Sequence, residues 1–145
     1  MTSGVSGEVD FVSAFKDAWR RVQKLLEKNL ASAGLTVSEL RILRSLSTNG
    51  PAPMTRLAGE LFMTPASVTG LIDKLEEEKL VERQRGTVDR RVVTVKITGK
   101  GSARLEEGLR LNSRFAARAL RSLSKEEVEQ LIDLLERLGD GAASA

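Results

Sequence analysis

The stretch VERQRGTVDRRVVTVKITGKG, from Val81 to Gly101, decides the fold of this 145-residue chain. Apolar and polar residues alternate on both sides of a connection that contains Gly86, and this period of two predicts a pair of β-strands joined as a hairpin. The segment holds six basic and two acidic residues, a net charge of +4, whereas the whole chain carries only +3. The positive charge of the chain is therefore concentrated in its predicted hairpin.

The tip of this hairpin, residues 86–91, ends in Asp89-Arg90-Arg91. A rigid arm with arginines at its end suits a phosphate backbone or a narrow, electronegative minor groove. Asp89 is expected to accept a hydrogen bond from a nearby arginine or from a turn amide, and so to fix the loop. The alternative is a merely solvated turn, because charged hairpin tips are common. The hairpin residues that we predict to bind DNA are Arg83, Arg85, Asp89, Arg90 and Arg91.

The residues before the hairpin predict a helix from Thr64 to about Lys79. Thr64-Pro65 is a helix start, because threonine caps the helix and proline suits its first position. The face opposite the apolar stripe is small and polar over two turns, which leaves room for close approach to base edges, and the helix N-terminus can bind a phosphate. A plain solvated surface is the alternative. The helix residues that we predict to bind DNA are Thr64, Pro65, Ala66, Ser67, Thr69, Gly70 and Lys74.

The other elements follow from helical spacing of apolar residues and from capping patterns at Thr36/Glu39 and Ser124/Glu127. Residues 1–9 and 141–145 are small and polar and are expected to be irregular, and 49–53 is expected to be a break. Helices are expected over 10–34, 36–48, 54–62, 98–119 and 124–140. The pattern predicts a mainly α fold with a small β-hairpin: a winged helix-turn-helix lobe over 35–98, with dimerisation helices over 10–34 and 99–139.

Dimerisation is predicted because the first and the last helices carry apolar stripes that are too long for so small a core. The two stripes are Phe11-Phe15-Ala18-Val22 and Val128-Leu131-Leu135-Leu138. We therefore expect each to pack against a second copy in a homodimer.

Composition excludes most enzyme chemistry. The chain has no cysteine, histidine or tyrosine, which removes thiol chemistry, the commonest general base and the commonest metal ligand. Glu76, Glu77 and Glu78 are consecutive in a helix, point about 100° apart and do not converge on a metal or a substrate. No enzyme activity, metal or cofactor is expected. No apolar run approaches the roughly 18 residues of a membrane span, and no signal peptide is visible, so a cytoplasmic protein is expected.

The motifs resemble those of the MarR family of bacterial and archaeal transcription regulators. The matching stretches are LTVSELRILRSLSTNGP, MTRLAGELFMTPASVTGLIDKLEEEKLVER and TVDRRVVTVKITGKG, within a resemblance over about 11–138. The resemblance implies a homodimer with two winged lobes on a pseudo-palindromic operator, and it makes Arg90 the candidate for minor-groove insertion. Many members also bind a small aromatic acid between dimer layer and DNA lobe. The residues that match this pocket are Trp19, Arg20 and Val37, with Arg91 or Arg20 available for a carboxylate.

The sequence therefore predicts a sequence-specific, double-stranded DNA-binding transcription regulator that acts as a homodimeric repressor, with a small aromatic acid as candidate effector. Two other interpretations remain open. One is an architectural DNA-binding protein of low specificity, and the other is a winged-helix protein-interaction module.

Overall fold

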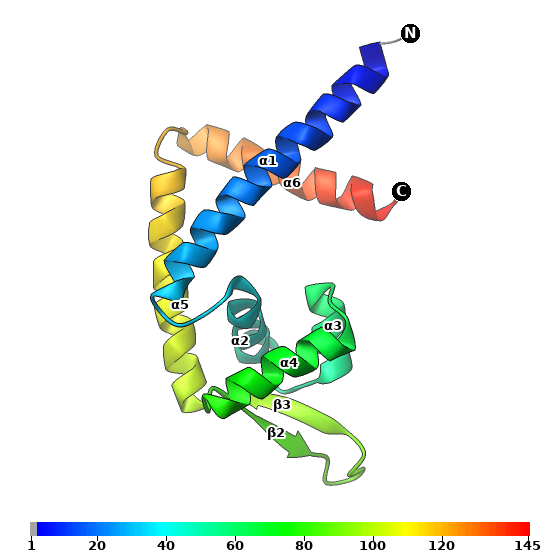
Figure 1. The fold of residues 1–145 in the computed structure, drawn as a ribbon, viewed down its shortest axis with the longest axis vertical. Coiled ribbons are helices and arrows are strands. Elements are labelled where there is room, and N and C mark those ends of the chain that lie inside the picture. The colour runs from blue at the N-terminus through cyan, green and yellow to red at the C-terminus, as the bar shows by residue number, and fades with distance from the viewer. Residues whose placement is uncertain (1–2) are drawn as a thin grey trace. The chain divides into compact units, whose positions relative to one another are not determined.

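The structure, a computed structural model, describes the backbone of residues 3–145 and the side chains of 7, 8 and 10–145. The described residues form six helices and three strands (Figure 1). In chain order these are α1 (Ser3–Ala31), α2 (Val37–Asn49), β1 (Ala52–Pro53), α3 (Met54–Leu61), α4 (Pro65–Glu77), β2 (Val81–Arg85), β3 (Val93–Ile97), α5 (Gly99–Ala119) and α6 (Lys125–Ala143). They fall into two compact units, 1–112 and 113–145. Among the described residues, none of the helices combines the length and the apolar character of a membrane span.

The core of the first unit lies between α2, α3, α4 and the sheet, which Figure 1 shows grouped together. Leu43, Leu57, Ile72 and Val95 contribute one fully buried side chain from each of these elements. Burial of such a side chain stabilises the fold by roughly 1.5–3 kcal/mol. The apolar stripe of α4 is thus held inward, which turns its opposite face to solvent.

Three threonines begin helices, as the sequence predicts. The side-chain oxygen of Thr36 accepts a hydrogen bond from the Glu39 amide at 3.2 Å, that of Thr64 from the Ser67 amide at 3.2 Å, and that of Thr98 from the Gly101 amide at 3.0 Å. Each cap satisfies an amide that has no partner within its helix. In the second unit, Ser124 and Glu127 form the predicted capping box of α6.

The hairpin prediction is confirmed, with Val81 opposite Ile97 and Arg85 opposite Val93. The structure adds a strand that the sequence prediction missed, since Ala52 of β1 pairs with Val95 and gives the sheet order β1-β3-β2. The predicted break over 49–53 therefore contains a strand. A two-residue strand has too few residues to show alternation, and proline is tolerated at a sheet edge because no donor is needed there.

The predicted irregular ends were wrong over residues 3–9 and 141–143, which are helical, whereas 144 and 145 lie outside the helix as predicted. Helix α1 begins at Ser3 rather than Asp10, and α6 continues to Ala143; residues 1 and 2 lie outside the described part. Once a helix is nucleated, each added residue gains a hydrogen bond, so a glycine costing about 1 kcal/mol does not end it. Small residues were thus weaker stop signals than expected.

Helices α1 and α6 each expose apolar side chains. On α1, Phe11, Phe15 and Trp19 are each more than 40% exposed, and α6 buries none of its residues. Phe11 and Phe15 stack on one another with ring centroids 5.9 Å apart. The C-terminal part of α1 is packed, since Leu30 is fully buried, but the apolar side chains from Phe11 to Leu25 and those of α6 are not covered within their own units.

Candidate DNA-binding interface

The start of α4 is organised by hydroxyl groups. The Thr64 hydroxyl donates to Ser67 Oγ at 2.9 Å while accepting from the Ser67 amide, and the Thr69 hydroxyl donates to the Pro65 carbonyl at 2.9 Å. These bonds fix the rotamers of three polar side chains on the exposed first two turns. Each hydroxyl oxygen keeps acceptor capacity for an outside donor.

Between these hydroxyls the exposed face of α4 carries no large side chain. Ala66 and Gly70 are exposed, and a Cβ placed on Gly70 would meet nothing within 4 Å. A helix with such a face can approach base edges closely, as a recognition helix in the major groove must. The structure thus confirms the exposure of the predicted face, and the DNA contacts themselves stay a prediction.

The loop between β2 and β3 is closed by its own backbone. The Gly86 amide donates to the Val92 carbonyl at 2.8 Å, and the Arg91 amide donates to Asp89 Oδ1 at 3.0 Å. Of the two expected partners of Asp89, the turn amide is therefore the one found. A Cβ at Gly86 would collide with the Asp89 carbonyl, so the loop needs glycine there. Arg90 and Arg91 are exposed at the tip of this hydrogen-bonded loop, and Arg85 is exposed at the end of β2.

Arg83 is less free than the other hairpin arginines. Its guanidinium forms ion pairs with Asp73 and, at 2.7 Å, with Glu76, and its amide donates to Glu76 Oε2 at 3.0 Å. Hydrogen bonding to Asp73, followed by the bond to Glu76, raises the pKa of Arg83 despite partial desolvation. Arg83 therefore links β2 to α4, a role that the sequence did not indicate.

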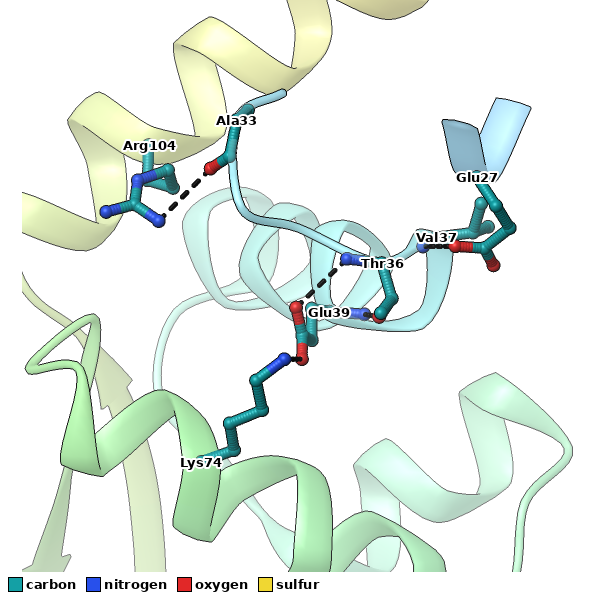
Figure 2. Close-up of polar contacts among 7 residues, drawn as sticks. All are labelled: Glu27, Ala33, Thr36, Val37, Glu39, Lys74 and Arg104. Carbon is teal, nitrogen blue, oxygen red and sulfur yellow. Dashed lines mark hydrogen bonds and ion pairs between the residues drawn. The ribbon is translucent and has the colours of Figure 1, made fainter. Parts of the chain in front are cut away.

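Lys74 is also held within the protein. Its Nζ lies 2.7 Å from Oε1 of Glu39, whose side chain is only 1% exposed (Figure 2). The hydrogen bond to Glu39, and then the charge of that carboxylate, raise the pKa of Lys74. The sequence placed Glu39 in a capping box, which uses one carboxylate oxygen. A buried second oxygen requires a partner, but nothing in the sequence identified the lysine 35 residues away.

The residues predicted for an effector pocket are exposed or bonded to neighbouring residues of the protein, and they do not line the depression that the structure shows. Trp19 is 55% exposed, Arg20 lies 3.8 Å from Asp17, and the Val37 amide donates to Glu27 Oε2 at 3.3 Å. An open depression of about 310 Å³ instead lies along α2 and α3. It is lined by Arg41, Arg44, Ser45, Thr48, Asn49, Glu60 and Leu61. The effector pocket stays a prediction.

Helix α4 has a capped start and an exposed face of small polar residues, and it packs on two further helices. It is followed by a hairpin with arginines at its tip. This arrangement defines a winged helix-turn-helix DNA-binding protein. Comparison with known proteins agrees. The model of the MarR family matches residues 35–93. The chain is 30% identical to the HTH-type transcriptional regulator MhqR of Bacillus subtilis, over 84% of each chain. It is 28% identical to the repressor MdtR of the same organism, over 92% of this chain and 86% of MdtR.

A solved structure shares the fold. The crystal structure of the transcriptional regulator BldR from Sulfolobus solfataricus superposes with a TM-score of 0.82 at 27% identity, over 96% of this chain and 99% of that one. The chain belongs to the MarR family and is a DNA-binding transcription regulator. Proteins of this family are non-enzymatic, so the chain is not an enzyme.

Proposed function

We propose that the protein is a homodimeric repressor that binds a pseudo-palindromic operator. The observation that carries this proposal is the exposed face of small polar residues on α4, followed by a hairpin whose hydrogen-bonded tip exposes arginines. In this arrangement the first two turns of α4 enter the major groove, and Arg90 reaches the adjacent minor groove, where negative potential attracts an arginine.

Dimerisation is supported by the exposed apolar side chains of α1 and α6. Val22 and Leu25 of α1 are 43% and 55% exposed, and Leu134 and Leu135 of α6 are 56% and 49% exposed. A second copy would remove these surfaces from water. Two lobes related by a two-fold axis read two half-sites, which explains why a near-palindrome is the expected target.

Repression is the direction of control that we propose, because MdtR is a repressor and a dimer occupying a promoter excludes polymerase. The test selects duplexes from a random-sequence pool with the wild-type protein. The recovered site is then placed at a promoter in a purified transcription reaction. We expect a near-palindrome and a fall in transcript with added protein. A rise in transcript contradicts repression, and recovery of no common sequence favours the architectural alternative.

An aromatic-acid effector is a separate proposal, supported by the position of Trp19 and Arg20 on α1 and of Val37 at the start of α2. A carboxylate could pair with Arg20, whose side chain is 79% exposed and meets Asp17 only at 3.8 Å. Its binding would alter the spacing of the two recognition helices and so weaken operator binding.

A further inference from the structure

Glu39 is the buried charged residue of the described core, and both of its carboxylate oxygens are used. Oε2 accepts the Thr36 amide at 3.0 Å, which closes the capping box of α2. Oε1 accepts from Lys74 Nζ at 2.7 Å, which reaches across from α4 (Figure 2). The first bond completes the cap of α2, whereas the second connects α2 to the recognition helix.

The two sides of α4 are bound by ion pairs to different elements, β2 on one side and α2 on the other. Asp73 and Lys74 are consecutive, so their side chains point about 100° apart. Asp73, with Glu76, holds Arg83 of β2, whereas Lys74 holds Glu39 of α2. The second half of α4 is thus fixed from both sides, and the first two turns carry the unobstructed face.

Further hydrogen bonds near Glu39 connect α2 and the preceding loop to α1 and α5 of the same unit. Glu27 of α1 accepts the Val37 amide at 3.3 Å, next to the cap of α2. Arg104 of α5 donates to the Ala33 carbonyl at 3.1 Å, just after α1 ends. Figure 2 shows these bonds around the corner between α1 and α2, with Lys74 approaching from α4. Lys74 is therefore attached to a corner at which hydrogen bonds join α1, α2 and α5.

We propose that Glu39 positions the recognition helix through Lys74, and that Lys74 acts as a positioning residue rather than as a phosphate contact. The inference rests on the proposed operator binding and assigns Lys74 a different role from that predicted by the sequence. An ammonium whose charge is matched by a buried carboxylate at 2.7 Å presents little net charge to a phosphate. Loss of either partner lets α4 shift, and a shift of about 1 Å is enough to disrupt base contacts.

The test is a double-mutant cycle on the duplex selected by the wild-type protein, with Glu39→Gln, Lys74→Met and both together. We expect each single variant to lose affinity by a similar factor, on the order of tenfold, and the double variant to lose no more than either. Lys74→Arg, which retains charge and donors, should restore most of the affinity. Thermal unfolding checks that each variant is folded under the binding conditions.

The salt dependence of binding separates positioning from contact. A lost phosphate contact reduces the slope of log affinity against log salt by about 0.9. We expect the wild-type slope in Lys74→Met and a reduced slope in the control Arg90→Met, whose side chain lies at the exposed tip. This comparison uses a half-exposed residue and stays decisive even if Glu39→Gln does not fold.

Two results overturn the inference. One is a slope reduced by about one in Lys74→Met, whatever the behaviour of Glu39→Gln. The other is additive losses in the double variant. Recovery of no selected duplex by the wild-type protein instead overturns the proposed function, an outcome that is visible before any variant is made.

Discussion

Gly70 lies at the centre of the exposed face of α4, where a Cβ would meet nothing within 4 Å. Glycine inside a helix costs about 1 kcal/mol relative to a good helix former. We therefore expect Gly70→Glu to keep or raise the melting temperature while abolishing duplex binding, because the new carboxylate would face phosphates and base edges. Differential scanning fluorimetry and fluorescence anisotropy measure the two effects.

The matched control is Gly59→Glu on α3, since a Cβ there also meets nothing within 4 Å. This variant adds the same charge to a different helix and should retain affinity. Full affinity in Gly70→Glu would show that this face of α4 does not meet DNA.

At the scale of the element, strand β2 carries two arginines, Arg83 and Arg85, to which we assign different roles: a structural link to α4 and a contact with DNA. Arg83 is 28% exposed and paired with two carboxylates on α4, whereas Arg85 is exposed. We expect Arg83→Met to lower stability by about 1 kcal/mol, the usual net value of a hydrogen bond, without changing the salt slope of DNA binding. Arg85→Met should lower the slope and leave stability unchanged.

Urea unfolding and binding titrations at several salt concentrations provide both readouts. A reduced slope in Arg83→Met would contradict its assignment as a link between β2 and α4.

The helices, the hairpin and the winged fold could be predicted from the sequence because each rests on local patterns. Thr64-Pro65 predicts the start of a helix, and the alternation of apolar and polar residues over 81–97 predicts paired strands. Contacts between distant residues could not be predicted this way. The sequence predicts Lys74 and Arg83 as DNA-binding residues, and only the packing of α4 against α2 and β2 brings them to Glu39, Asp73 and Glu76.

The assembled molecule is expected to be a dimer, because α1 and α6 expose apolar side chains that are not covered within their own units. We predict burial of well over about 2,000 Å² in total on association, the range of obligate interfaces. Sedimentation equilibrium at micromolar concentration should therefore give twice the chain mass of 15.8 kDa. Leu135→Glu, which adds a charge to α6, should shift the equilibrium towards monomer, and a 15.8 kDa wild-type species would contradict the dimer.

An effector would also act on the whole molecule. We expect millimolar salicylate to weaken duplex binding with a coupling of about 1–3 kcal/mol, at matched ionic strength so that salt does not imitate the effect. Trp19 is the only tryptophan, so its fluorescence reports binding near the predicted pocket. Unchanged affinity and unchanged fluorescence would leave a regulator that does not respond to this class of acid.

The most direct test of the central claim is the ratio of affinities for the selected duplex and for a random duplex at one salt concentration. A sequence-specific regulator that reads bases with α4 and the minor groove with Arg90 should bind its selected site at least about 10³-fold more tightly. A ratio near one would contradict the account and would leave a protein that binds DNA through backbone charge alone.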